Sequence, residues 1–198
     1  MIATFAAAAT EDIWNGRETK AARTIPKSIW SVVRRKLDLL NRVARLDALR
    51  VPPGNRFEAL RGARTGSYSI RVNDQYRITS HFERSPSMKS AAKITTSVRR
   101  RLPTHRPPTH PGEMLLEEFL RPLGITQMDA AARMGVPFQR MNTLVKGRRG
   151  VTADTALRLA ALTGMDAGFW MGLQADYDLW HALRDVDLSK ITPLKKSA

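Results

Sequence analysis

The spacing of small and apolar residues in the C-terminal half constrains the fold more than any other feature. Counting Gln127 as position 1, Ala131 falls at position 5 and Gly135 at position 9. Two helices that cross at a tight turn need a small side chain at the first of these positions and a left-handed backbone at the second. The remaining inward positions are apolar: Ala130, Met134, Val136, Met141 and Leu144. This spacing predicts a helix-turn-helix; the alternative is a small helical bundle without a DNA-binding role.

The rest of this half is also typical of helices. Five helix-sized segments are separated by Gly, Pro, Thr or Asp: 111–124, 126–135, 137–147, 152–164 and 166–185. Thr126 and Thr152 are suitable N-caps, and Gly135, Gly147 and Gly164 are suitable helix ends. We therefore predict an all-α domain of five helices.

In a helix-turn-helix, the second helix, at about 137–146, enters a major groove with its N-terminal part first. Gln and Asn can pair with adenine and Arg with guanine, while basic side chains and a helix N-terminus suit phosphate. The predicted DNA-binding residues are Gln127, Phe138, Gln139, Arg140, Asn142, Thr143, Lys146, Arg148, Arg149 and Thr152.

An aromatic stripe at helical spacing follows the predicted helix-turn-helix. It consists of Phe169, Trp170, Leu173, Tyr177 and Trp180. Core packing is the expectation for Phe169 and Leu173, and part of the stripe could form a dimer interface. Helix-turn-helix proteins usually read two half-sites as dimers, so we expect a homodimer.

The N-terminal half mixes helix and strand signals. Residues 26–44 have apolar residues at helical spacing and predict an amphipathic helix. Residues 67–72 and 76–82 alternate, and the short stretch between them indicates a hairpin. A three-residue loop at 73–75 would pair Ile70 with Ile78 and Arg71 with Arg77, which keeps the apolar face uniform. The prediction is a small α+β domain.

The positive charge is concentrated in the first half and the centre. Residues 1–87 carry a net charge of +8, residues 88–106 carry +6 and residues 107–198 carry +1. Such a surplus favours a polyanionic partner such as nucleic acid over a merely solvated basic surface. The sequence shows no basic amphipathic helix with a large apolar face, so a membrane surface is not the expected partner.

Cysteine and long apolar runs are both absent from the sequence. Disulfides and thiolate metal sites are thereby excluded, and no segment reaches the roughly 20 residues that span a bilayer. The first ten residues do not have the pattern of a signal peptide. We expect a cytoplasmic protein with no membrane partner, no cofactor and no metal.

The stretch "PGEMLLEEFLRPLGITQMDAAARMG" and the following residues to about 183 closely resemble the HigA (VapI-like) antitoxins of the XRE helix-turn-helix group. The resemblance begins at about residue 104. It implies a lambda-repressor-like fold and a dimeric, operator-binding repressor that also neutralises a cognate toxin.

The stretch "VPPGNRFEALRGARTGSYSIRVNDQYRI" at 51–78 resembles the HigB toxins of the RelE/ParE superfamily, and the match covers about residues 1–83. It implies a RelE-like fold, with a small sheet packed on two helices, and a ribosome-dependent messenger-RNA endonuclease. In this family the toxin gene precedes the antitoxin gene, which is the order found in this chain.

Cleavage of RNA through its 2′-hydroxyl needs a base, an acid and cations for the charge that develops on phosphorus. Arg71 opposite Arg77 is unfavourable unless an anion lies over the pair. We predict Arg71, Arg77, Glu58 and His81 as catalytic residues. Arg56, Arg61 and Arg64 are predicted to bind RNA; the alternative is a solvated basic face.

The HigB-like toxins end in a further strand closed by an acidic residue, an aromatic residue and a histidine, and no such triplet follows residue 83. The expected domains are a toxin-type domain at 1–87, a basic flexible linker at 88–106 and an antitoxin domain at 107–198. We interpret Met88 as a former start codon at the seam, and 93–98 as a possible substitute strand.

Three functions remain open from the sequence. The preferred one is a fused toxin–antitoxin that binds DNA and represses its own transcription, with weak or no RNase activity. The others are an active endoribonuclease restrained by its fused antitoxin, and an inactive toxin domain that binds a free antitoxin. The expected partners are operator DNA, ribosome-bound messenger RNA, and toxin and antitoxin segments in contact within or between chains.

Overall fold

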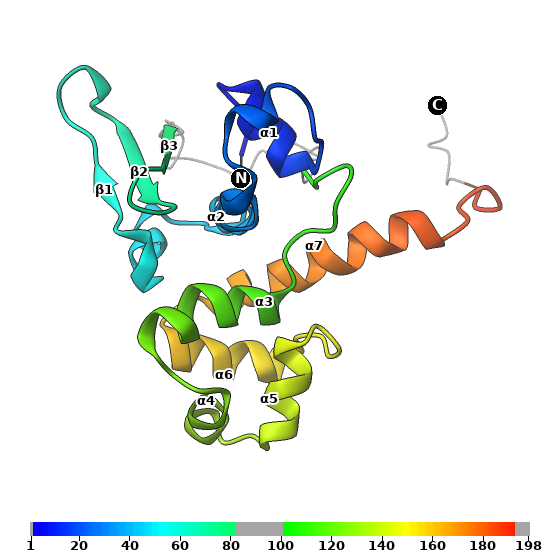
Figure 1. Ribbon diagram of the computed structural model, residues 1–198. Helices are drawn as coiled ribbons and strands as arrows, with labels where there is room; N and C mark the ends of the chain where they lie inside the picture. The colour runs from blue at the N-terminus through cyan, green and yellow to red at the C-terminus, as the bar shows by residue number, and fades with distance from the viewer. Residues whose placement is uncertain (1, 82–100, 193–198) are drawn as a thin grey trace, which may run out of the picture.

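A computed structural model describes residues 2–81 and 101–192 of the chain (Figure 1). Its N-terminal part combines helices with an antiparallel sheet in the strand order β1-β2-β3. The elements are α1 (Ala8–Asn15), α2 (Trp30–Arg42), β1 (Glu58–Ala59), β2 (Ser67–Arg71) and β3 (Arg77–His81). Short 3-10 turns lie between them: η1 (Ala22–Thr24), η2 (Lys27–Ile29), η3 (Leu46–Arg50), η4 (Pro53–Asn55) and η5 (Gly62–Arg64).

The β2–β3 hairpin has the register that the apolar alternation predicts. Ile70 lies opposite Ile78, and Arg71 lies opposite Arg77. Ile70 is buried, so a slip by one residue would turn its side chain to solvent and expose the apolar face. Neither α1 nor β1 was predicted from the sequence. The two residues of β1 are too few to show any alternation.

Helix α2 forms within the predicted range 26–44, and the 3-10 turn η2 leads directly into it. Its apolar residues Val33, Leu37 and Leu40 are buried, as their spacing indicates. The opposite side of α2 is buried as well, because it carries Arg35, Lys36 and Asp38, which are each less than 9% exposed. The C-terminal part of the chain covers this polar side.

The C-terminal part is helical at each of the five predicted segments. The helices are α3 (Pro111–Leu115), α4 (Gln127–Met134), α5 (Phe138–Val145), α6 (Ala153–Thr163) and α7 (Ala167–Asp185). Helix α3 continues through a π-helical turn, η6 (Leu116–Leu120), and a 3-10 turn, η7 (Arg121–Leu123).

The predicted caps lie where these helices begin and end. The hydroxyl of Thr126 accepts a hydrogen bond from the backbone N–H of Asp129 at 3.1 Å, and Thr152 caps α6 in the same way. The Thr126 hydroxyl also donates to the Asp129 carboxylate at 2.7 Å, and this second hydrogen bond holds the pKa of Asp129 below its usual range. Gly135 and Gly164 end α4 and α6 in the left-handed conformation.

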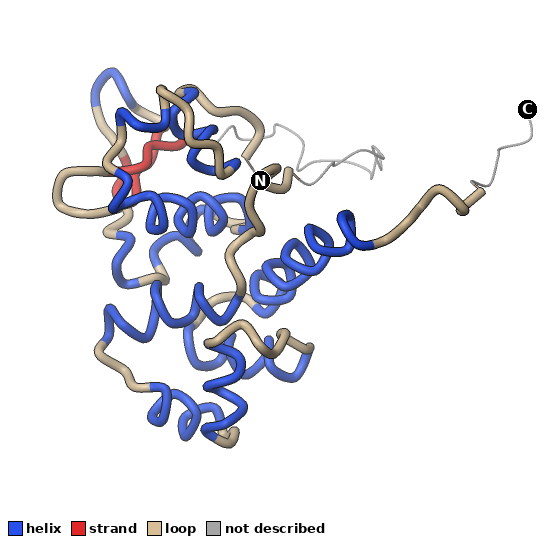
Figure 2. The backbone as a smooth tube through the Cα atoms, turned by 45° about the vertical axis from the view of Figure 1, so that its right-hand side comes forward, coloured by secondary structure: helices blue, strands red, loops and turns tan. Residues whose placement is uncertain are grey.

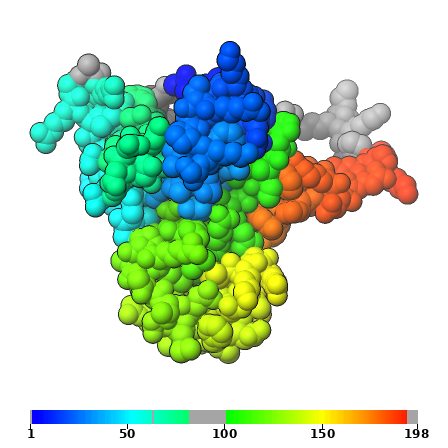
Figure 3. All heavy atoms as spheres, in the orientation of Figure 1, coloured from blue at the N-terminus to red at the C-terminus, as the bar shows by residue number. Residues whose placement is uncertain are grey.

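The two parts share a continuous apolar core. Trp14, Leu39 and Leu49 are buried in the first part, and Phe119 and Trp170 in the second. The N-terminal part lies against α3 and the first half of α7, and the rest of α7 extends to one side (Figures 1 and 3). A second view shows the same extension of α7 (Figure 2).

Residues 101–106 belong to the predicted flexible linker, yet hydrogen bonds hold them to the N-terminal part. The N–H of Thr104 donates to Asn15 Oδ1 at 3.2 Å, and Arg106 Nε donates to the carbonyl of Trp14 at 2.6 Å. Met88 and the predicted substitute strand at 93–98 lie outside the described residues. Within the two described ranges, no helix is long and apolar enough to cross a membrane.

Candidate nucleic-acid interfaces and the contact between the two parts

Helices α4 and α5 form the helix-turn-helix that the spacing predicts. Ala130, Ala131, Met134, Met141 and Leu144 are all buried. The small side chain of Ala131 permits the close crossing of the two helices, and the left-handed turn falls at the predicted glycine. Helix α3 packs closely against the end of α5 and so fixes its position. A Cβ at Gly112 would come within 1.9 Å of the carbonyl oxygen of Leu144.

Several predicted DNA-binding side chains lie open to solvent around α5. Phe138 and Gln139 are exposed in its first turn. Lys146, Arg148 and Arg149 are exposed on the loop that follows, and this loop ends at the exposed Thr152. The hydroxyl of Thr143 donates back to the carbonyls of Gln139 and Arg140 within α5. The exposed face therefore consists of the first turn of α5, the basic loop that follows α5 and the N-terminus of α6.

Other predicted DNA-binding residues are held by partners within the domain. Asn142 Nδ2 donates to Gln127 Oε1 at 3.0 Å, which ties the two predicted residues to each other across the motif. Arg140 Nη2 contacts Asp154 Oδ2 at 2.5 Å and Thr155 Oγ1 at 2.7 Å. These contacts fix the orientation of the Arg140 and Asn142 side chains at the edge of the exposed face.

Asp154 and Arg158 belong to this arrangement and were not predicted. The hydrogen bond from Arg140, and next to it the one from Arg158, hold the pKa of Asp154 below its usual range. Arg158 also donates to the carbonyl of Met134 at the end of α4, at 2.8 Å. The four-residue spacing between Asp154 and Arg158 was the available sequence signal, since it predicts an ion pair on a helix.

The sheet of the N-terminal part places all four predicted catalytic residues on one face. Glu58 lies opposite Ser69, while Arg71 lies opposite Arg77. His81 lies opposite Ser67 at the other end of the hairpin. Because side chains alternate along a strand, these residues share the face that Ile70 does not occupy.

Carboxylates of the chain itself compensate the two facing arginines. Arg71 pairs with Asp74 in the hairpin loop. Arg77 Nη2 lies 3.1 Å from Glu58 Oε2, and Arg77 also donates to Ser69 Oγ at 2.9 Å. The repulsion expected between the opposed arginines is thus relieved without an external anion.

The predicted RNA-binding arginines are exposed near this face. Arg61 precedes η5, Arg64 is its last residue, and Arg56 precedes β1. Arg56 has a φ of 41°, in the left-handed region, and its carbonyl accepts a hydrogen bond from Arg77 at 2.7 Å. The backbone of Arg56 thus helps to position Arg77 while its side chain stays accessible.

The contact between the two parts is built on a buried carboxylate that was not predicted. Glu118 in η6 is 3% exposed. Its Oε2 lies 2.5 Å from Lys36 Nζ, and its Oε1 lies 3.1 Å from Arg35 Nε, both on α2. Lys36 also donates to Asn55 Oδ1 at 2.6 Å. Two cations and one acid are thus removed from water together, and each has a partner.

A second buried carboxylate, Asp38 on α2, fastens the segment that leads into α3. It accepts hydrogen bonds from Trp14 Nε1 at 2.9 Å and from Arg106 Nη2 at 2.8 Å. Its other oxygen accepts from the N–H and the hydroxyl of Thr109. Further along α2, Arg42 pairs with the buried Asp176 of α7 at 3.3 Å. These side chains lie off the apolar stripe that the sequence analysis used, and periodicity gave no signal of the contact.

Comparison with known proteins agrees with both parts of the structure. The family model for the RelE-like toxin HigB of type II toxin-antitoxin systems matches residues 9–90. Toxin HigB-1 of Vibrio cholerae is 49% identical over 61 residues, which are 31% of this chain and 64% of that toxin.

Two antitoxin-type relatives match the helical part. Virulence-associated protein I of Dichelobacter nodosus is 43% identical over 93 residues, which are 46% of this chain and 86% of that protein. Antitoxin HigA-1 of Vibrio cholerae is 45% identical over 78 residues, which are 39% of this chain and 72% of that antitoxin.

A small α+β part joined to a helix-turn-helix part, each with relatives of its own, defines a fused toxin–antitoxin protein. The chain belongs to the HigA antitoxin family and carries a HigB-like toxin domain ahead of its antitoxin domain.

Proposed function

We propose that the chain binds operator DNA in a major groove through α5 and represses transcription from its own promoter in the cytoplasm. The observation that carries this proposal is the exposed set of polar and basic side chains on α5 and the loop after it. The exposed Gln139 has the amide chemistry that pairs with a base, while Arg148, Arg149 and the N-terminus of α6 at Thr152 suit backbone phosphates.

The proposed organisation follows from the same contacts. We infer a RelE-like domain at 1–87, a connecting segment at 88–106 and a lambda-repressor-like domain of five helices at 107–198. The toxin-like domain is docked within the chain on its own antitoxin domain, through Arg35 and Lys36 on Glu118. Because the two domains belong to one chain, each is present at a high effective concentration near the other. This favours the docked arrangement.

Operator binding is tested with labelled DNA from the region upstream of the gene. We expect fluorescence anisotropy to show saturable binding by the full chain that weakens steeply as salt rises, because phosphate contacts release counterions. A scrambled duplex of the same length is the control. Equal affinity for both duplexes would contradict specific operator recognition, and no binding at low salt would exclude the function altogether.

We also infer a homodimer formed through the antitoxin domain. Phe169 and Leu173 are buried in the core, as expected, and Trp170 is buried with them, so these three residues of the stripe do not support an interface. The exposed apolar residues Met171, Leu179 and Leu183 of α7 are the surface that supports association instead. A symmetric dimer would present two copies of α5 to two half-sites.

The second candidate function is messenger-RNA cleavage on the ribosome. The exposed face that carries Glu58, Arg77 and His81 favours it, and the extensive contacts of the antitoxin domain in the described structure are with α2 and η4. Two observations argue against it. Arg77 already pairs with Glu58 and donates a hydrogen bond to Ser69, and the terminal triplet of the toxin family does not follow residue 83.

We expect the full chain to show no RNase activity above background. Cleavage of ribosome-bound messenger RNA should be equal for the unaltered chain and for Arg77→Ala, measured by primer extension on a translated reporter. An active HigB-like toxin assayed in parallel is the positive control. Cleavage by the unaltered chain that Arg77→Ala reduces by about tenfold or more would establish the endoribonuclease instead.

A further inference from the structure

An aromatic ring lies open to solvent at the beginning of α5, the helix that is proposed to enter the major groove. The ring belongs to Phe138, which is 47% exposed in the first turn of this helix. Within residues 2–81 and 101–192, every other Phe, Tyr and Trp side chain is buried or half-buried. A ring in this position gains the free energy of full burial only when a binding partner covers it.

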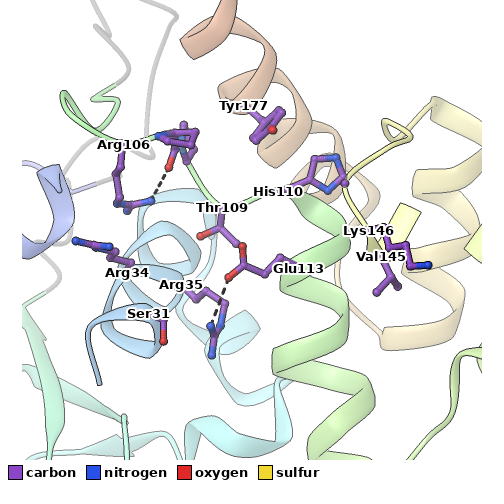
Figure 4. Close-up of a pocket in the computed structure, with 13 residues that line it drawn as sticks. Ser31, Arg34, Arg35, Arg106, Thr109, His110, Glu113, Val145, Lys146 and Tyr177 are labelled. Atoms are coloured by element: carbon purple, nitrogen blue, oxygen red, sulfur yellow. Dashed lines mark hydrogen bonds and ion pairs between the residues drawn. The ribbon is translucent and has the colours of Figure 1, made fainter. Parts of the chain in front are cut away.

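The two ends of α5 have different surroundings. Val145 and Lys146, at its C-terminal end, line the cleft between the two domains together with side chains of α2 and α3 (Figure 4). The beginning of α5 lies on the side of the antitoxin domain that faces away from the toxin-like domain (Figure 1). A recognition helix enters the major groove with its N-terminal part first, so the docked toxin-like domain leaves Phe138 and Gln139 accessible to DNA.

Three of the polar side chains on α5 are already engaged within the antitoxin domain. Arg140 is held by a carboxylate and a hydroxyl group of α6. Asn142 donates to the first residue of α4, and the hydroxyl of Thr143 donates to carbonyls of α5 itself. In the described part of the chain, the side-chain amide of Gln139 has no hydrogen-bond partner. Gln139 can therefore present both its donor and its acceptor to a base.

We propose that Phe138 and Gln139 read A·T base pairs of the operator, Phe138 through the methyl group of a thymine and Gln139 through N6 and N7 of an adenine. This inference rests on the operator binding proposed above. In the major groove, the methyl group distinguishes thymine from cytosine and offers an apolar surface to the ring. The glutamine amide donates to N7 and accepts from the N6 amino group, which makes a bidentate pair.

The position of Arg140 explains why guanine is not the base that α5 reads. An arginine can bind O6 and N7 of guanine, but the guanidinium of Arg140 is paired with Asp154. Releasing it to a guanine would leave Asp154 with one cation fewer beside a polyanion, which is electrostatically unfavourable. Arg140 therefore stays with α6, and base recognition falls to the two residues before it.

The test is a scan of the operator duplex with two base analogues, measured by fluorescence anisotropy with the full chain. Deoxyuridine in place of one thymine at a time removes only the methyl group, and 7-deazaadenine replaces N7 of adenine with C–H. We expect deoxyuridine to weaken binding by about fourfold at one thymine of each half-site, because a single methyl group is buried there. We expect 7-deazaadenine to weaken binding by about tenfold at one adenine near that thymine.

Variants of the chain assign each effect to its side chain. Phe138→Ala should abolish the effect of deoxyuridine, and Gln139→Ala should abolish that of 7-deazaadenine, because variant and analogue remove the same contact. Leu188→Ala is the matched control, since it truncates an exposed apolar side chain beyond the end of α7 and should leave both scans unchanged. Circular dichroism confirms that each variant folds, and the scans of the unaltered chain do not depend on the variants.

The outcomes separate this inference from the proposed function. A flat scan with either analogue, on a duplex that the unaltered chain binds specifically, overturns the inference and leaves operator binding intact. An effect of deoxyuridine that persists in Phe138→Ala, or an effect of 7-deazaadenine that persists in Gln139→Ala, also overturns it. If the unaltered chain binds no operator, the proposed function fails and the inference fails with it.

Discussion

Replacing Glu118 with alanine is expected to lower the free energy of unfolding of the full chain by about 3–5 kcal/mol. Glu118 is buried between α2 and η6, where it pairs with both Lys36 and Arg35. Without the carboxylate, Lys36 stays 3% exposed, and among the described residues Asn55 is left as the hydrogen-bond partner of its ammonium group. Desolvation of that unpaired charge is the source of the loss. Urea denaturation followed by circular dichroism measures it.

Glu113→Ala is the matched control, because Glu113 also pairs with Arg35, at 3.4 Å, but is half exposed. Its loss should cost less than about 1 kcal/mol, since solvent screens such a pair. The double variant Lys36→Met/Glu118→Leu should recover most of the stability, because apolar residues of similar size can replace a buried pair. Equal costs for Glu118→Ala and Glu113→Ala would show that burial of the pair contributes nothing.

The second large effect is expected at the DNA-binding face. The double variant Arg148→Gln/Arg149→Gln should weaken operator binding by about tenfold or more at low salt, because two phosphate contacts are lost. The plot of log affinity against log salt concentration should become shallower by about 0.9 for each contact removed. Fluorescence anisotropy at several salt concentrations gives both values.

The control for this experiment is Arg23→Gln/Arg45→Gln. It removes the same total charge from exposed positions of the toxin-like domain. Its salt dependence should match that of the unaltered chain if binding is local to the helix-turn-helix. If both double variants shift the affinity equally, the interaction follows net charge, and the assignment of Arg148 and Arg149 to phosphate contacts is wrong.

The sequence predicted the positions of several candidate site residues but not the partners that hold them. The opposition of Arg71 and Arg77 followed from the apolar alternation, and the structure has that register. The partners of these arginines did not follow, because Asp74 and Glu58 approach them from the hairpin loop and from a strand too short to be recognised. On the DNA-binding face, the exposure of Gln139 was predictable from helical spacing. The ion pair between Arg140 and Asp154 was not, because it depends on how α6 packs beside α5.

By itself the sequence determined the local architecture. Ala131 and Gly135 specify the helix-turn-helix, Thr126 and Thr152 cap its helices, and the alternation around Ile70 sets the hairpin register. These features depend on neighbours within a few residues or one strand away, so periodicity and capping chemistry are sufficient to predict them.

Only the tertiary structure decided what becomes of the polar side of α2. Helical spacing leaves Lys36 and Asp38 off the apolar stripe of α2, and nothing near them in the sequence indicates that they are buried. Their partners Glu118 and Arg106 lie more than sixty residues further along the chain and arrive only when the connecting segment and the antitoxin domain dock. A buried charge is stable only beside such a partner, so the joining of the two domains depends on contacts that no local pattern encodes.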